Sequence, residues 1–333
     1  MTALPTYKDL LMRQDAPPGS TWGLFGPDDE VGTLNFIGPE ERRAAAACVR
    51  RGVAFNLDLP LDAFRIPPAR HRGVPRHRIF ANSPHHRDDV IDNLYPQGST
   101  QIDGLRHFAH PRHGFYNGMP AERVTEGSPS LGINRYADHG ILGRGVLLDV
   151  ERYLQKTECR TLDHAAGEAF GPDLLDAVAS DAGVTLRRGD ILLMRTGWLT
   201  HYFTRIDDAG RAEVARDLRS PGLVQGHGTL EWLWDHGIAM IASDNAGIEA
   251  IPVSPASPFA AEAHSAPGAQ ALHTGMMHPI LIGLMGLALG ELWNLDPLAA
   301  DCAEDGVYDV LTVAKPLNLT GGVGSPANAM AVK

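Results

Sequence analysis

Three short apolar runs constrain the fold of this chain more than any other feature. They cover residues 145–150, 190–195 and 238–243 and consist mainly of aliphatic side chains. Runs of this length and composition predict strands that are buried on both faces, as in a parallel sheet. Residues 172–183 and 230–235 have helical patterns, so strands and helices alternate along this half of the chain. We therefore predict an α/β fold, in which polar residues that follow buried strands are candidate site positions.

The rest of the chain adds elements but no segment that separates two halves. Four further elements are predicted: a helix over 41–51, a strand over 53–57, a long apolar helix over 277–293 and a last strand over 307–313. A chain of 333 residues is long enough for one large domain or two. Because no linker is visible, we predict an N-terminal extension over 1–21 and a single large domain over 22–330.

Composition excludes several classes of partner. The chain has 29 Lys and Arg against 40 Asp and Glu, a net charge of −11, which disfavours a nucleic-acid-binding protein. Its three cysteines are widely spaced, which disfavours a disulfide framework or a cysteine-based zinc site. The first residues show no secretory signal pattern, and no apolar stretch reaches the roughly 20 residues that span a bilayer. We expect a soluble, cytoplasmic protein without membrane or nucleic-acid partners.

Residues 65–87 have an unusual composition for a core element. They contain six arginines, four histidines and four prolines, so we predict a loop or arm outside the core. Two interpretations are open for this arm. It is either a solvated surface loop, or an arm that reaches a neighbouring subunit or covers a site for an anionic ligand.

Residues 97–107 carry the highest density of polar side chains. On an extended segment the side chains of Gln97, Gln101 and Asp103 point to the same face, because successive side chains alternate. So many polar groups are costly unless they bind a ligand or one another. The alternative interpretation is a polar turn in which Asp103 caps a helix.

A second polar signal lies in the apolar run that begins at His278. Glu291 lies thirteen residues later, and a carboxylate in such surroundings needs a cation or a hydrogen-bond donor. A turn at Met285-Gly286 could return Glu291 toward His278, whereas the alternative is a surface glutamate at a helix end.

His107, His110 and His113 also have the spacing of one helical face, but Pro111 interrupts a helix there and disfavours a three-histidine metal site.

These two segments together resemble the cyclase family that includes bacterial kynurenine formamidase and isatin hydrolase. The family signature H-x-G/S-T-H-x-D-x-x-x-H corresponds in spacing to Q-G-S-T-Q-I-D-G-L-R-H at residues 97–107. The later family pattern of His, Gly, Glu and Leu is matched by His278, Gly286, Glu291 and Leu292. The resemblance implies an α/β fold of the swivelling β/β/α type, a homo-oligomer (dimer or tetramer) and a metal-dependent hydrolase.

The resemblance also implies site residues. The positions that correspond to the family's metal ligands are Gln97, Gln101, Asp103, His278 and Glu291, and His107 corresponds to the family's catalytic histidine. This chain departs from the signature because both signature histidines are glutamines. The resulting oxygen-rich set suits Mn²⁺ or Mg²⁺ better than Zn²⁺. Two alternatives are a single ion held by Asp103, His278 and Glu291, and a site without metal.

We therefore expect an enzyme that hydrolyses the carbonyl of an amide, lactam or lactone in a small metabolite. The divalent ion would activate water, and His107 would act as general base and then as general acid. Trp198, Phe108 and Arg106 are the candidate substrate-binding residues. The alternatives are a metal-independent lyase or cyclase that uses His107 and Asp103, and a non-catalytic protein that binds a small molecule.

Overall fold

The computed structural model describes residues 4–260 and 274–333. Its helices are α1 (Tyr7–Leu11), α2 (Pro39–Ala46), α3 (Asn134–His139), α4 (Val150–Glu158), α5 (Pro172–Asp181), α6 (Trp198–Thr200), α7 (Asp208–Arg216), α8 (His227–Asp235), α10 (His278–Gly283) and α11 (Asp296–Asp305), with 3-10 turns at Gly32–Phe36, Tyr116–Gly118 and Ala121–Arg123 and a π-helix at His201–Arg205. Its strands are β1 (Ala54–Asn56), β2 (Arg76–Ser83), β3 (His86–Asp92), β4 (Gln101–Asp103), β5 (Ile141–Asp149), β6 (Ala169–Phe170), β7 (Ile191–Arg195), β8 (Gly222–Leu223), β9 (Met240–Ser243), β10 (Ala288–Glu291), β11 (Asp309–Ala314), β12 (Gly324–Pro326) and β13 (Ala329–Val332).

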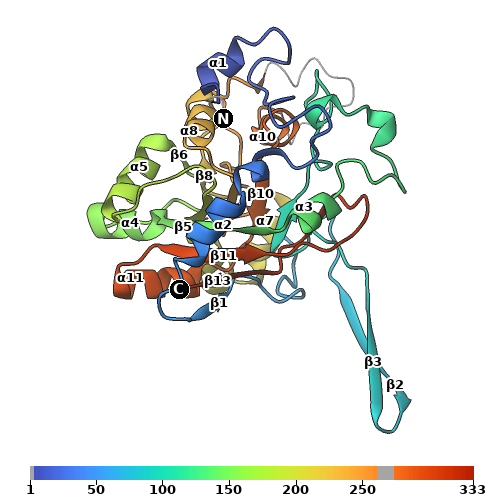
Figure 1. Ribbon diagram of the computed structural model, residues 1–333. Coiled ribbons are helices and arrows are strands. Elements are labelled where there is room, and N and C mark those ends of the chain that lie inside the picture. The colour runs from blue at the N-terminus through green and yellow to red at the C-terminus, as the bar shows by residue number, and fades with distance from the viewer. Residues whose placement is uncertain (1–3, 261–273) are drawn as a thin grey trace.

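A mixed sheet forms the centre of the molecule (Figure 1). The strand order is β1-β13-β11-β5-β7-β9-β10-β4-β12. The four strands β5, β7, β9 and β10 run parallel, and the strands on both sides of them pair antiparallel. The predicted α/β fold in one large domain is confirmed, and the three apolar runs form β5, β7 and β9. Their side chains are buried because helices cover a parallel sheet.

Local sequence explains where several helices begin. Pro172 is the first residue of α5, and Pro39 is the first residue of α2. Proline suits this position because an N–H group there would have no partner within the helix. The Glu41 carboxylate accepts a hydrogen bond from the Gly38 N–H (2.9 Å) and so caps the start of α2. The predicted helix over 41–51 is too long, because α2 ends at Ala46.

The predicted helix over 277–293 is wrong. The run divides into α10, which ends at Gly283, and strand β10, which begins at Ala288. Gly286 lies in the turn between them with a φ of +64°, and a Cβ there would meet the Tyr116 ring at 2.4 Å. The chain can therefore turn sharply only because this residue is a glycine. The strand over 307–313 is present as β11, but it is not the last one, because β12 and β13 follow it.

Helix α1, near the N-terminus, is packed into the fold. Tyr7 and Leu10 of α1 are buried in the main core, and the Tyr7 N–H donates to the Asp235 carboxylate (2.8 Å). The segment predicted as an extension over 1–21 is thus packed against the body where it is described, while its first three residues lie outside the described part. The boundary between 1–21 and 22–330 stays a prediction.

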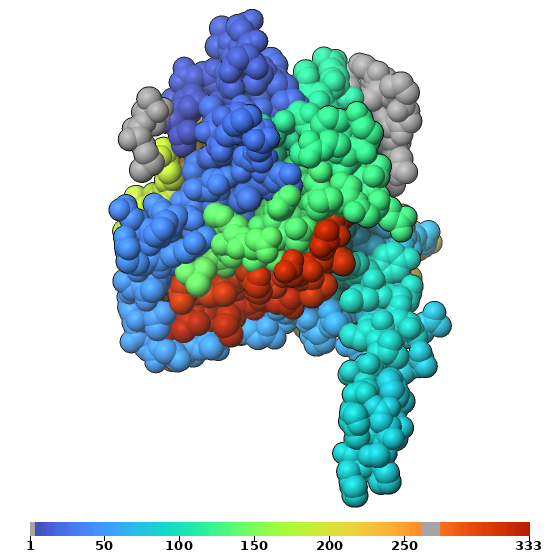
Figure 2. Space-filling view, turned by 45° about the vertical axis from the view of Figure 1, so that its right-hand side comes forward, coloured from blue at the N-terminus to red at the C-terminus, as the bar shows by residue number. Residues whose placement is uncertain are grey.

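The arginine-rich segment forms a hairpin outside the core, and its two interpretations, a solvated surface loop and an arm with a partner or a ligand, both stay predictions. Strands β2 and β3 pair as an antiparallel hairpin, and every residue in both strands is exposed. Figure 1 shows the hairpin extending away from the sheet, and Figure 2 shows it as an isolated projection. The regular strands were not predicted, and the hairpin extends past the expected limit of residue 87 to Asp92.

Candidate functional site

The two polar segments of the sequence meet in the sheet. Strand β4 pairs with β10 on one side and β12 on the other, and this register places Gln101 opposite Glu291. His278 is the first residue of α10, and the turn that follows this helix leads into β10. As a result the ligand atoms of Asp103, His278 and Glu291 all lie within 4.8 Å of one another, and the three residues are buried. The predicted convergence of the early and late segments is confirmed as geometry.

Hydrogen bonds connect the members of this group. The Gln101 Nε2 donates to Glu291 Oε2 (2.5 Å), and His278 Nε2 lies 3.1 Å from Glu291 Oε1. The Gln97 side-chain amide donates to Asp103 Oδ1. All five positions that correspond to the family's metal ligands are therefore gathered in one place. Both glutamines donate to carboxylates of the group, and the Gln101 amide oxygen has no hydrogen-bond partner in the described structure.

Glu249 belongs to the same group but was not predicted. Its carboxylate accepts hydrogen bonds from the backbone N–H groups of Met277 and His278, and it lies 2.6 Å from His278 Nδ1. The imidazole of His278 is thus held between two carboxylates with Nε2 toward Glu291. The sequence signal for Glu249 is an acidic residue between apolar neighbours, Ile248 and Ala250, soon after a buried strand.

Negatively charged side chains outnumber positively charged ones in this group. Asp103, Glu249 and Glu291 are buried around one imidazole. Burial by itself favours a neutral imidazole, but the hydrogen bonds to Glu249 and Glu291 outweigh that effect and raise the pKa of His278 to about 10. Even a protonated His278 leaves an excess of buried negative charge, which is costly without a further cation.

Two buried oxygen atoms point to where a cation fits. Asp103 Oδ2 and Gln101 Oε1 are buried and have no hydrogen-bond partner in the described structure. Carboxylate and amide oxygens with one imidazole nitrogen are suitable ligands for a divalent ion, and one ion with bonds of about 2.0–2.5 Å can bridge atoms at these separations. The residues present therefore fit a divalent metal ion.

His107 lies beside this group at its more exposed side. Its Nε2 is 3.7 Å from Asp103 Oδ1, and 22 % of its side chain is exposed. Phe108 packs edge-on against both His107 and His278, with ring centroids 4.6 and 5.5 Å apart. Phe108 therefore contacts two members of the site, and its substrate-binding role stays a prediction. The rings of His110 and His113 stack on each other at 4.8 Å, and the metal-capable group found in residues 4–260 and 274–333 does not include them.

Arg106 is differently placed. Its guanidinium donates to the backbone carbonyls of Gly321 and Thr125, and burial lowers its pKa. These bonds connect two loops, whereas the buried Nε atom of Arg106 has no hydrogen-bond partner in the described structure. The predicted substrate-binding role of Arg106 therefore has no support in the contacts of the site and stays a prediction.

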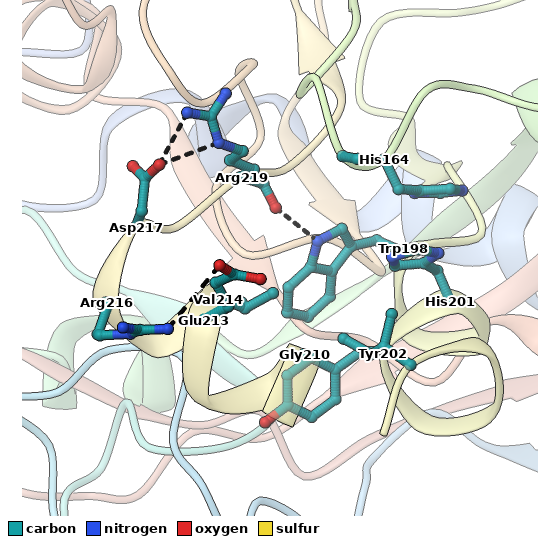
Figure 3. A pocket seen from close by; sticks show the side chains of 12 residues that line it. His164, Trp198, His201, Tyr202, Gly210, Glu213, Val214, Arg216, Asp217 and Arg219 are labelled. Atoms are coloured by element: carbon teal, nitrogen blue, oxygen red, sulfur yellow. Dashed lines mark hydrogen bonds and ion pairs between the residues drawn. The ribbon is translucent and has the colours of Figure 1, made fainter. Parts of the chain in front are cut away.

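Trp198 lines a larger pocket of about 570 Å³ beside α6 and α7 (Figure 3). Its indole N–H donates to the Arg219 carbonyl (2.9 Å), and its ring stacks on Tyr202. His164 and His201 stack on each other in the same pocket. The ring of Trp198 packs in one apolar cluster with Leu292, the residue that follows Glu291. Trp198 thus shares an apolar cluster with the residue next to Glu291. Its substrate-binding role stays a prediction.

A small cavity opens directly beside Glu291. It measures about 30 Å³, which is the room that one water molecule takes in the liquid. Gln97, Leu292 and Arg72 are among its lining residues, and Arg72 donates to the Gln97 carbonyl (2.5 Å). The described conformation therefore has room for an ion or a water molecule beside Glu291.

Comparison with known proteins agrees with this geometry. The family model described as "Putative cyclase" matches residues 57–250. The chain belongs to the cyclase family. A crystal structure described as a novel cyclase is 32% identical over 94% of this chain and 99% of that one, with a TM-score of 0.79. The recognition made from the two motifs is confirmed.

More distant members share the fold. Isatin hydrolase A from Ralstonia solanacearum is 18% identical over 87% of this chain and 94% of its own, with a TM-score of 0.53. The same enzyme from Labrenzia aggregata, bound to benzyl benzoate, is 18% identical over 86% of this chain and 94% of its own, with a TM-score of 0.50. No curated protein matches the chain. In the described residues, every helix is too short or too polar to cross a membrane.

Proposed function

We propose that this protein is a metal-dependent hydrolase that cleaves an amide, lactam or lactone carbonyl of a small molecule. The observation that carries the proposal is the buried group of Asp103, His278 and Glu291, in which Asp103 Oδ2 has no partner. Two structures that share the fold are named isatin hydrolases, which supports the choice of a hydrolase.

Asp103, His278 and Glu291 would hold the ion, with the amide oxygens of Gln101 and Gln97 as further ligands. A bound divalent ion supplies Lewis-acid chemistry toward a carbonyl group and toward water. Because four of the five candidate ligands offer oxygen, we propose Mn²⁺ or Mg²⁺ before Zn²⁺. Glu249 orients His278 through Nδ1, as carboxylates commonly do for metal-binding histidines.

His107 is the group that can move protons at this site. Its imidazole is partly exposed and lies near Asp103, so it can reach both a water molecule and the leaving group of a substrate beside the ion. The nearby Asp103 carboxylate orients the ring. We propose that His107 first takes a proton from the attacking water at Nε2 and then gives it to the leaving nitrogen or oxygen.

Metal analysis of protein purified without chelator, followed by assays on aryl formamides, lactams and lactones with the ion found, tests this proposal. We expect about one ion per chain in the wild type, and loss of both ion and activity in Asp103→Asn. Asp28→Asn is the matched control, because that carboxylate is exposed and distant in sequence from the site. Active wild-type protein free of metal would contradict the proposal and favour acid–base chemistry by His107 and Asp103 alone.

A second variant separates proton transfer from metal binding. His107→Ala should keep the ion but lower kcat by about 10²- to 10⁴-fold, the usual contribution of a general acid or base. His113→Ala serves as control, because His113 is exposed and stacks only on His110 among its described ring contacts. Full activity of His107→Ala would contradict the assigned role, even if the metal analysis agreed with the rest.

A further inference from the structure

The pocket beside α6 and α7 is separate from the metal-capable group. Its volume of about 570 Å³ lies within the range of about 300–1,000 Å³ that small-molecule sites occupy. Asp217 and Arg219 line this pocket, whereas Leu218 between them lines the small cavity beside Glu291. The two hollows therefore share a loop but no lining residue, and the proposed metal chemistry does not account for the larger one.

One wall of the pocket is built on an unusual backbone form. The π-helix at His201–Arg205 follows α6 directly, and its residues His201 and Tyr202 line the pocket (Figure 3). A π-helix is rare in proteins and occurs frequently at functional sites. The backbone of this wall therefore favours a functional role over a purely structural one.

Two stacked imidazoles lie at this wall. The ring centroids of His164 and His201 are 4.6 Å apart, and their planes are inclined by 15°. The buried Glu151 carboxylate lies 3.9 Å from His164 Nε2, which favours a proton on that nitrogen. The other nitrogen, Nδ1, is buried without a hydrogen-bond partner in the described structure. An unpartnered buried nitrogen is costly, so the stack indicates a role other than stability.

His201 is the partly exposed member of the pair and can bind a ligand. No hydrogen bond joins its ring nitrogens to another of the described residues. Burial, and after it the neighbouring His164, lowers the pKa of His201, so the ring is neutral near pH 7. A neutral imidazole has one N–H donor and one acceptor nitrogen. His201 can therefore form a hydrogen bond with a ligand that offers either a donor or an acceptor.

The charged side chains around the pocket balance one another. Arg219 pairs with Asp217 (2.7 Å), and Arg216 lies 3.8 Å from Glu213. All four side chains are well exposed, and they comprise two positive and two negative charges. An ion of either sign therefore gains little net attraction here, and the pocket favours a neutral ligand.

The inner wall of the pocket is aromatic and aliphatic. Trp198 and Tyr202 stack on each other with ring centroids 5.2 Å apart, and Ile206 and Val214 also line the pocket. Flat rings pack well against other flat rings in stacked or edge-on arrangements. The pocket therefore favours an aromatic ligand over a saturated one of the same size.

We propose that this pocket is a binding site for a small, neutral aromatic molecule that forms a hydrogen bond with the His201 imidazole. The site shares no lining residue with the cavity beside Glu291. Its test therefore does not depend on the proposed function.

Titration with phenol, followed by NMR of protein with isotope-labelled histidine, tests the site. Phenol is the probe because it is neutral, aromatic and has one O–H group. We expect the imidazole signals of His201, identified by their absence from His201→Phe, to shift until the site is saturated. The signals of His113, identified in the same way with His113→Phe, should not shift, because His113 is exposed and does not line the pocket. Unchanged His201 signals up to the solubility limit of phenol would overturn the proposal.

Two further probes test the chemical class of the ligand. Cyclohexanol has the same hydroxyl on a saturated ring, and benzoate has an aromatic ring with a negative charge. Both should bind about tenfold or more weakly than phenol, because one lacks a flat ring and the other loses hydration of its charge. Equal affinity for cyclohexanol would overturn the aromatic class, and equal affinity for benzoate would overturn the neutral one.

Two variants test where phenol binds, through its affinity measured on the signals of phenol itself. His201→Phe keeps a flat ring without nitrogens and should weaken binding about tenfold, the usual contribution of one hydrogen bond. Val214→Phe puts a larger side chain into the pocket and should abolish binding. Val49→Phe is the matched control, because Val49 is exposed on another part of the surface. Circular dichroism shows which variants are folded, and wild-type phenol affinity in either folded pocket variant would overturn the proposal.

Discussion

Replacement of Glu249 by glutamine is the sharpest test of how the site is held together. The Glu249 carboxylate is fully buried and accepts the N–H groups of Met277 and His278, and it also binds the His278 Nδ1 atom. Glutamine keeps the size of the side chain but has one acceptor oxygen in place of two and no charge. The substitution therefore changes the support of His278 while every proposed metal ligand stays in place.

Two effects of known size follow from these contacts. Loss of a group that orients a metal-binding histidine usually weakens metal binding by about 10- to 100-fold. That factor corresponds to about 1.4–2.8 kcal/mol. Glutamine also leaves one of the buried N–H donors around this position without an acceptor, which lowers the free energy of unfolding by about 1–3 kcal/mol. We expect Glu249→Gln to show both the weaker metal binding and a lower melting temperature.

The assay is Mn²⁺ titration by calorimetry, with a thermal melt in the presence and absence of the ion. Glu126→Gln is the control, because this glutamate is exposed and lies outside the site. Added Mn²⁺ should raise the melting temperature of the control as in the wild type, and raise that of Glu249→Gln less. A Glu249→Gln protein with wild-type Mn²⁺ affinity would refute the assigned orienting role, whatever its stability.

Three further predictions concern the metal, the stability and the substrate. Gln101→His replaces an amide by an imidazole and should raise the affinity for Zn²⁺ relative to Mn²⁺ by about tenfold or more, as competition dialysis can measure; an unchanged ratio would contradict a ligand role for position 101. Burial raises the pKa of Asp58 to about 6, so its protonated form favours folding. The stability of the wild type relative to Asp58→Asn should therefore be highest below pH 4 and fall by about 3 kcal/mol as the pH rises through 6, in denaturant titrations; a rise would contradict the sign. Arg72→Gln should raise KM for carboxylate-bearing substrates only, whereas Arg76→Gln on the exposed hairpin should not; equal effects would show that the charge of the arm acts at long range.

The sequence predicted which residues come together better than it predicted the elements that carry them. The family resemblance in motif spacing singled out Asp103, His278 and Glu291, and the structure gathers these residues in one buried group, whereas their role as metal ligands stays a prediction. The apolar run after His278 left no such pattern, since a short buried helix and a buried strand have the same composition. The division of that run depends on Gly286 and on its contact with Tyr116, which is distant in sequence.

Glu249 and the hairpin show two other limits of prediction from the sequence. Glu249 binds a side chain 29 residues away, so neither periodicity nor a local motif indicated their contact. Alternation in residues 76–92 is masked because both faces of the hairpin carry polar and apolar side chains, whereas strand prediction depends on one buried face. The arginine-rich composition indicated only that this segment lies outside the core.

Strand β4 also limits how this site can change during evolution. Gln101 and Asp103 lie on one face of a three-residue strand that is paired on both edges, with Ile102 buried on the opposite face. Inserting or deleting one residue there would turn both polar side chains away from His278 and Glu291 and put an isoleucine in their place. Descendants of this protein can therefore acquire a new metal preference by exchanging side chains, whereas a change in the length of this strand abolishes the site.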